Sequence, residues 1–538
     1  MTIALRTRTF SRTSLILLAS TACLALSACD GADSVASPGE GVIVVPGTPT
    51  PSPTPSPTPT PTAGTPATSC PSGTTDVGIL GTYRSCRLPS LITSALSLPK
   101  VAGVAYEING RVDVGVDIGG AGSAPGGIAT TLTIAAGSLI YANTTNADND
   151  YMVVNRGSKL IAEGTETQPI IFTAQANITG GVTDESQGLW GGIILAGRAP
   201  ISNCNNTVPG GNAACENVVE GTSTALYGGA TPTDSSGSVR YVQIRYSGTV
   251  ISPNNELQGL TLGGTGSGTT LDHIQIHNSS DDGIEIFGGR SNLRYLALTG
   301  SDDDGLDTDV GWQGFVQFVL AIQKPTNTQT DNYSTEIDSN GSEDAVPRQA
   351  YNLANFTFIE TSSATNAAIR LRGGADATFV NGIVSNPTSA CLNVIAGADA
   401  GGKTTIRPAN ADLQDKGPPV FNSVVFSCLT PYAETTVNGV TVTTAEQQAL
   451  FRAGTNNTES AAVGSAVTGT FLPAGVSTTT TAFNAATLNP AGTAFLVNTN
   501  YVGAVNGTTD TWYRGWTCNS NRANFGTTSG ACTALPTS

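Results

Sequence analysis

The sequence from 271 to 311 contains the same short unit twice, LDHIQIHNSSDDGIEIFGG and NLRYLALTGSDDDGLDTDVG. In each copy a strand with alternating apolar residues leads into an Asp-rich turn, and a second short strand follows. The Asp-Asp-Gly of the two turns, at 281–283 and 303–305, are 22 residues apart. A repeat of this length, built only from short strands and polar turns, is typical of a solenoid whose units bury their apolar faces against one another.

The same pattern of strand, turn and strand continues on both sides of this unit. Upstream, 132–142 and 152–164 repeat at a spacing of 20 residues, and downstream the pairs extend to 419–427. Helical patterns are nearly absent, which excludes βαβ packing and leaves parallel strands stacked about 4.8 Å apart. We therefore expect an all-β fold, a right-handed parallel β-helix over 101–434. A β-sandwich is the alternative, and the regular spacing disfavours it.

Both ends of such a solenoid need a cap, because the terminal coils would otherwise expose apolar surface and unpaired strand edges. Residues 70–100 are expected to form the N-terminal cap, with a short amphipathic helix over 90–98. Residues 435–538 are less regular and are expected to form a C-terminal region and cap, with a helix over 445–454.

The N-terminus has the features of an export signal. Three arginines within the first 12 residues precede a short apolar segment, 15–26, which is too short to span a membrane as a helix. The following Leu-Ser-Ala-Cys resembles the bacterial lipobox, which implies cleavage before Cys29 and acylation of its thiol. We therefore expect residues 1–28 to be a lipoprotein signal peptide and Cys29 to carry a membrane anchor.

Residues 29–69 are expected to be the lipidated cysteine and a tether. Within them, 46–66 alternates Pro with Thr or Ser, which favours an extended polyproline II spacer. Asp30 resembles the inner-membrane retention signal of enteric lipoproteins, although some lipoproteins that carry it reach the surface. We expect a location in the cell envelope, in the outer membrane or at the cell surface rather than in the inner membrane.

Eight cysteines remain after the signal peptide and Cys29, and they fall into four pairs that are close in sequence. In an exported protein such a set predicts disulfides. Zinc binding is the alternative, but the sequence has no C-x-x-C and only two histidines. The expected bridges are Cys70–Cys86, Cys204–Cys215, Cys391–Cys428 and Cys518–Cys532.

The formal charge of −16 argues against a nucleic-acid partner, whose phosphates require clustered Lys and Arg. No GxSxG, HExxH, P-loop or dinucleotide fingerprint occurs in a suitable context, so no catalytic residue is assigned.

Strand alternation predicts a ladder of carboxylates at one outward position of successive coils. Its expected members are Glu285, Asp307 and Asp338, with Asp309 beside them. Carboxylates on adjacent coils would lie about 5 Å apart, and like charges at that distance are unfavourable unless something compensates them.

Three kinds of compensation are open. Ca²⁺ takes six to eight oxygen ligands and suits such a ladder, so Glu285, Asp307, Asp309 and Asp338 are candidate metal ligands. Ion pairs with Arg370 and Arg372 would be a purely structural answer. A carboxyl held protonated as a general acid would be a catalytic one, as in glycosidases. His273 and His277 lie on one outward face, where solvation is favoured over metal binding.

Several phrases in order resemble a family of bacterial surface and secreted lipoproteins with a β-helix core. They are GLWGGIILAGRAPI (188–201), RYVQIRYSG (240–248), the Asp-rich 271–289 and 302–318, and YVGAVNGTTDTWYRGWT (501–517). The resemblance implies a β-helix, export and a lipid anchor, and it brings no established reaction. Polygalacturonase-like β-helices also place Asp on successive coils, but their GHG and RIK-type motifs do not occur here.

The sequence therefore predicts a lipid-anchored envelope or cell-surface β-helix protein with a binding or structural role, stabilised by calcium. Two alternatives remain open: a polysaccharide-acting hydrolase or lyase of pectinase-like build, and an accessory lipoprotein of an outer-membrane uptake or secretion system. The expected partners are the membrane, through the lipid, and a polysaccharide or an envelope protein.

Overall fold

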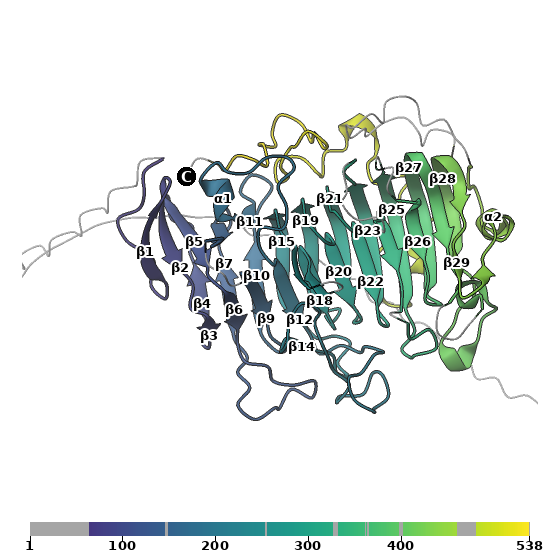
Figure 1. The fold of residues 1–538 in the computed structure, drawn as a ribbon, viewed down its shortest axis with the longest axis horizontal. Coiled ribbons are helices and arrows are strands. Elements are labelled where there is room, and N and C mark those ends of the chain that lie inside the picture. The colour runs from purple at the N-terminus through teal and green to yellow at the C-terminus, as the bar shows by residue number, and fades with distance from the viewer. Residues whose placement is uncertain are drawn as a thin grey trace, which may run out of the picture. The chain divides into compact units, whose positions relative to one another are not determined.

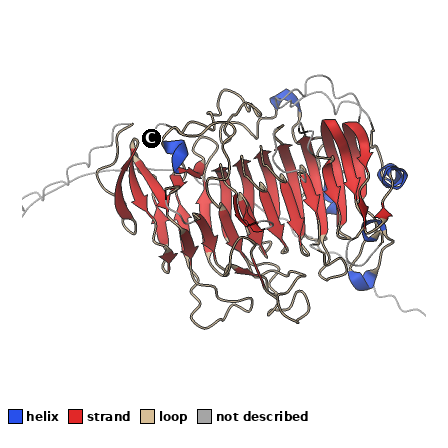
Figure 2. Cartoon of the chain, in the orientation of Figure 1, coloured by secondary structure: helices blue, strands red, loops and turns tan. Residues whose placement is uncertain are grey.

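Parallel strands form the framework of the chain that the computed structural model describes, as one sheet of 24 strands (Figures 1 and 2). The described residues are 64–145, 149–252, 255–325, 332–339, 341–360, 362, 365–397, 402–459 and 480–536. Residues 1–63, with the predicted signal peptide, Cys29 and most of the tether, lie outside them. The predicted all-β parallel β-helix is confirmed.

Each coil contributes a strand to each of three ladders, which we number 1 to 3. Ladder 1 contains β4 (Leu96–Leu98), β7 (Thr131–Ile134), β10 (Lys159–Glu163) and the first parts of β15 (Gly237–Arg245), β19 (Thr270–His277), β21 (Asn292–Thr299), β23 (Gln313–Ile322), β25 (Ala350–Ile359), β27 (Asp376–Val394) and β28 (Val420–Ala433). Ladder 2 contains β1 (Thr75–Leu80), β2 (Tyr83–Arg87), β5 (Val104–Ile108), β8 (Leu139–Ala142), β11 (Ile170–Ala174) and the later parts of the same long strands. Ladder 3 contains β3 (Leu91–Ile92), β6 (Arg111–Val114), β9 (Tyr151–Val154), β12 (Ile193–Ala196), β18 (Leu260–Gly263), β20 (Ile284–Phe287), β22 (Leu306–Asp309), β24 (Thr335–Ile337), β26 (Ala367–Leu371) and the ends of β27 and β28.

The 22-residue spacing of the repeat determines which residues of adjacent coils pair with each other. Leu271 pairs with Leu293, and Ile284 pairs with Leu306. Because apolar residues alternate along every strand, their side chains stack inside the solenoid as one continuous core.

The long strands bend between ladders 1 and 2 at one residue with left-handed backbone angles. The bend residues have φ from 49° to 64°; they are Tyr241, His273, Tyr295, Phe318, Asn355, Asn381 and Ser423. Their alignment stacks the rings of Tyr241, His273, Tyr295 and Phe318, with successive centroids 4.2, 4.4 and 4.7 Å apart. Ring stacking offsets part of the strain that a left-handed backbone imposes on residues other than glycine.

The first coil differs from the expectation for residues 90–98. The predicted helix is wrong: these residues form β3 and β4, which pair with β6 and β7. The segment therefore belongs to the solenoid, because parallel pairing of β3 with β6 and of β4 with β7 outweighs a weak helical pattern. The antiparallel pair β1–β2 precedes this coil.

The remaining elements are short and lie between or after the coils. The hairpins are β13 (Asn217–Val218) with β14 (Leu226–Tyr227), β16 (Thr249–Ser252) with β17 (Asn255–Leu257), and β29 (Thr436–Val437) with β30 (Val440–Thr441). The helices are α1 (Gln175–Ile178), α2 (Thr444–Ala453) and the 3₁₀ turns η1 (Thr404–Ile406), η2 (Ala411–Leu413), η3 (Ala485–Leu488) and η4 (Gly507–Thr509). Among these described helices, none is long and apolar enough to cross a membrane.

The predicted helix over 445–454 is present as α2. Thr443 and Glu446 form a capping box at its N-terminus. Phe451 of α2 packs on Phe426, with ring centroids 4.2 Å apart, and so covers the core at the last coil.

Residues 480–536, which we call the C-terminal strap, do not form the expected cap at the C-terminal end. They run back along the outside of the coils toward the first one (Figure 1, yellow). Side chains of the coils donate hydrogen bonds to its carbonyls: Ser423 to Thr481, Gln317 to Val497, Gln243 to Trp516, and Tyr83 to Pro536. The sequence separation of these contacts rises from 58 to 453 residues, so the strap passes the coils in reverse order.

The four predicted disulfides are confirmed. They are Cys70–Cys86, Cys204–Cys215, Cys391–Cys428 and Cys518–Cys532, with Cα–Cα distances of 5.5, 4.9, 5.5 and 4.9 Å.

Candidate cation site

Carboxylates from the turns after ladder 2 and from the outer side of ladder 3 come together as one group, which we call the acidic column. Its members are Asp281, Asp282, Glu285, Asp303, Asp304, Asp307, Asp309, Glu336 and Asp338. Glu285 pairs with Asp307, as the sequence predicted.

The register of the column differs from the prediction at β24. Asp307 pairs with Glu336 rather than with Asp338. Thr335 takes an inward position beside Leu306, and its hydroxyl donates to the Leu306 carbonyl at 2.8 Å. Asp338 therefore lies beside Asp309 rather than beside Asp307. Its backbone N–H donates to the carbonyl of Thr308, and its side chain is close to that of Asp309.

Most of the column is buried, although strand alternation predicted an outward face for it. Glu285 is 5% exposed and Asp309 is 6% exposed. The loop closed by Cys204–Cys215 and the hairpin β13–β14 cover this side of ladder 3, and the ring of Tyr227 lies 5.8 Å from that of Phe287.

Two sets of three carboxylates are arranged closely enough to share a cation. Asp281, Asp282 and Asp303 form one set, and Asp282, Glu285 and Asp307 form the other. Within each set one oxygen per residue lies within 4.8 Å of the others. Asp303 and Asp307 are only partly buried, which gives the sets contact with solvent.

The hydrogen bonds of these side chains leave part of their charge uncompensated. Asp281 accepts from Gln258 at 3.3 Å, and Asp282 accepts from the backbone N–H of Asp304 at 2.9 Å. Among the described residues, Glu285 Oε2 and Asp309 Oδ1 are buried without a hydrogen-bond partner. Buried carboxylate oxygens of this kind are costly unless a cation or a proton satisfies them.

Burial and mutual repulsion shift the pKa values of the column upward. Burial, followed by the charges of Glu256 and Glu220, raises the pKa of Asp281 to about 8. Burial and the charges of Asp282 and Asp307 raise the pKa of Glu285 well above its ordinary value. Without a cation, the protonated forms of Asp281 and Glu285 are therefore favoured.

Among the described ion pairs, those that arginine makes with the column lie at its C-terminal end. Arg372 lies 2.5 Å from Glu336 and 2.8 Å from Asp338. Arg370 is 3.9 Å from Glu336, and its guanidinium donates to the hydroxyl of Tyr333 at 2.6 Å. The predicted ion-pair compensation thus applies at Asp338, and no ion pair among the described residues reaches Asp281, Asp282 or Glu285.

Of the four predicted metal ligands, the structure brings Glu285 and Asp307 into one set with Asp282. Asp309 and Asp338 lie beside them in the next position, nearer to Arg372. Asp281, Asp282 and Asp303 lie in the repeated turns that the sequence shows, but they were not among the predicted metal ligands. The 22-residue spacing of the Asp-Asp-Gly turns indicates that these carboxylates stack on adjacent coils, and it could have added them to the predicted ligands.

The two histidines lie apart from the column, and both are largely shielded from solvent. His273 is stacked between Tyr241 and Tyr295 at the bend. His277 is 0% exposed and its Nδ1 is 3.0 Å from the hydroxyl of Thr299, beneath the strap. The expectation of a solvated face is wrong here, because the strap covers ladder 2.

The comparison with protein families agrees with the β-helix architecture. A family model described as a pectate-lyase-like β-helix domain matches residues 126–517. The chain belongs to this family. In a pectate-lyase-like β-helix, successive coils place equivalent side chains in columns, which is how the repeat assembles the acidic column. Comparisons with curated proteins and with solved structures gave no match.

Proposed function

We propose that this protein is a lipid-anchored β-helix protein of the cell envelope, in the outer membrane or at the cell surface. Its role is binding or structural, and Ca²⁺ bound in the acidic column stabilises it. The observation that carries the calcium assignment is the set Asp282, Glu285 and Asp307, in which Glu285 Oε2 is buried without a hydrogen-bond partner among the described residues.

Calcium suits this site better than the other compensating groups. Ca²⁺ is a hard cation that binds carboxylate and carbonyl oxygens in irregular geometry, and each set of the column offers three carboxylates. Bound there, it would neutralise charge that Arg372 does not reach, and Asp282 would contribute to both sets.

The burial of the column favours this role over the polysaccharide-acting alternative. A glycosidase needs a pair of carboxyl groups in contact with a sugar chain. Here Tyr227 and the loop of Cys204 and Cys215 cover the outward side of Glu285 and Asp309. Release of reducing ends or unsaturated products from a panel of polysaccharides by the purified protein would favour the enzymatic alternative instead.

The lipid anchor rests on the lipobox that ends at Cys29, and it is tested separately. Cells expressing the wild type and a Cys29→Ser variant are labelled with radioactive palmitate and then fractionated. We expect label and membrane association only in the wild type. A labelled Cys29→Ser protein would refute the anchor without affecting the calcium proposal.

The accessory-lipoprotein alternative is tested with the same membranes. Proteins that co-purify with the wild type from detergent-solubilised envelopes, and are lost with Cys29→Ser, would identify an uptake or secretion machine as the partner.

A further inference from the structure

The second half of the C-terminal strap, residues 504–536, lies on ladder 2 without joining it as a strand. Among its described residues the only regular element is the short turn η4. It is held instead by side chains of the coils, which bind its backbone, and by apolar packing of its aromatic residues, among them Tyr513 and Trp516, on ladder 2. Gln275 accepts from Cys518 N–H at 2.7 Å and donates to Cys518 O at 3.0 Å, and Gln243 donates to Trp516 O.

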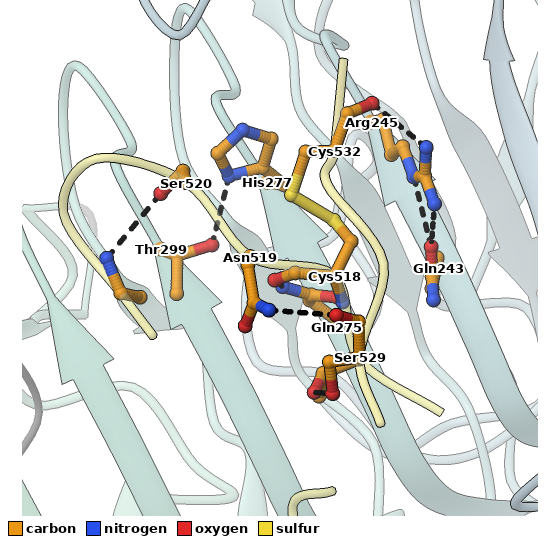
Figure 3. The surroundings of a disulfide bond; sticks show 12 residues. Gln243, Arg245, Gln275, His277, Thr299, Cys518, Asn519, Ser520, Ser529 and Cys532 are labelled. Carbon is orange, nitrogen blue, oxygen red and sulfur yellow. Dashed lines mark hydrogen bonds between the residues drawn. A yellow bond between two sulfur atoms is a disulfide. The ribbon is translucent and has the colours of Figure 1, made fainter. Parts of the chain in front are cut away.

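The Cys518–Cys532 bond joins two of the points at which this segment is attached (Figure 3). Between them, Arg522 forms an ion pair with Glu185. Cys518 is bound by Gln275 of β19. On the other side, Arg245 of β15 donates to the carbonyls of Cys532 at 2.8 Å and of Ala534 at 2.9 Å. Both cysteines are shielded from solvent, at 1% and 0% exposure.

Docking of the strap buries a positive charge that has no carboxylate partner among the described ion pairs. Arg245 is 2% exposed, and it donates only to uncharged oxygens, those of Gln243, Asn177 and the strap carbonyls. Burial lowers the pKa of Arg245 to about 10. Since a buried guanidinium without a counter-ion is unfavourable, the docked state needs additional stabilisation.

The coils beneath do not need the strap for the backbone hydrogen bonds of their strands. The strands of ladder 2 pair with one another along the solenoid, whereas the contacts of the strap at Cys518 and Cys532 close separations of 243 and 287 residues. Such contacts form only after the coils, because each requires the closure of a long loop.

We propose that residues 504–536 form an oxidation-gated clasp, which stays docked on ladder 2 only when Cys518 and Cys532 are joined, while the β-helix folds without that bond. Closure converts two thiols into one disulfide. The two electrons and two protons pass to an oxidant of the disulfide class, which leaves as a dithiol. In a reducing compartment the clasp is open, and in an oxidising one it closes.

The test compares the wild type with a Cys518→Ser/Cys532→Ser variant by hydrogen–deuterium exchange. In the variant we expect exchange of 504–536 to be faster by about 100-fold, the ratio expected when a loop of this length is no longer closed. Exchange in β15, β19 and β21 should remain slow. Acrylamide should also quench more fluorescence, because two of the four tryptophans, Trp512 and Trp516, lie in the clasp and Trp190 and Trp312 lie in the core.

Two further variants make the test specific. Cys204→Ser/Cys215→Ser removes a local disulfide elsewhere and should leave 504–536 protected. Gln275→Ala removes two hydrogen bonds with the disulfide intact, and the clasp should stay docked. The proposal is overturned if 504–536 remains protected in the Cys518→Ser/Cys532→Ser variant, if the whole β-helix unfolds in that variant, or if Gln275→Ala alone releases the clasp.

Discussion

Asp282 is the residue at which the two carboxylate sets meet. It lies in the turn between β19 and β20, and one of its oxygens accepts from the backbone N–H of Asp304 in the next coil. Burial and the charges of Asp281 and Asp307 raise its pKa well above the ordinary value. The residue therefore serves as an acceptor that fixes the turn and as a charge that requires compensation.

Changing Asp282→Asn should remove most of the calcium response. The amide keeps the acceptor for Asp304 N–H but lacks the charge that both sets share. We expect calcium to raise the melting temperature of the variant much less than that of the wild type, and the calcium-free variant to be more stable than the calcium-free wild type at pH 8. Asp412→Asn, at an exposed position, is the control and should respond as the wild type does.

Arg372, rather than Arg370, is expected to be the important cation of the column. Arg372→Ala leaves Glu336 and Asp338 without their closest positive charge and should cost about 1–3 kcal/mol in urea unfolding with EGTA present. Arg370→Ala should cost less, because the closest approach of Arg370 to Glu336 is 3.9 Å. An equal or larger loss with Arg370→Ala would contradict this assignment.

At the scale of elements, the sequence predicted the strands of ladder 3 but not the register of every one. The two Asp-rich units share length and pattern, so the pairing of β20 with β22 followed directly from the 22-residue offset. A polar segment of different length separates β23 from β24. The prediction assumed that only apolar residues face inward, and it therefore placed Asp338 opposite Asp307. In the structure Thr335 occupies an inward position, and its hydroxyl donates to the carbonyl of Leu306.

The path of the strap was not predictable from local patterns. Its contacts join residues hundreds of positions apart, and the side chains that bind it, such as Gln243 and Gln275, alternate along their strands as solvated residues would. For the same reason the sequence placed His277 at the surface. Local pairs were easier to predict: all four disulfides join cysteines at most 37 residues apart.

The cover over the acidic column can be tested through Tyr227 of β14. Tyr227→Ala should cost about 3 kcal/mol or more as a large core truncation. It should also admit water to Asp309 and Glu285, lower their pKa values and weaken the dependence of stability on pH. Tyr106→Ala, in the core of an early coil, should cost a similar amount and leave the pH dependence unchanged. Urea unfolding at pH 5 and pH 8 measures both effects.

For the whole molecule, the buried column makes stability depend on pH in a direction opposite to that of paired surface carboxylates. Asp281 ordinarily titrates near 3.8, and its pKa in the folded protein is raised to about 8. Between these values the folded state holds a proton that the unfolded state releases, so the free energy of unfolding falls as pH rises. Calcium would replace the protons and remove this loss at neutral and alkaline pH.

Thermal unfolding of the purified protein at pH 8, with EGTA and with millimolar calcium, tests the calcium claim most directly. If calcium binds only the folded state, it should raise the free energy of unfolding by about 2.7 kcal/mol at a hundredfold excess over Kd. The gain should be smaller at pH 5, where protons already occupy the column. An equal melting temperature with EGTA and with calcium at pH 8 would contradict the proposal that calcium stabilises the folded protein.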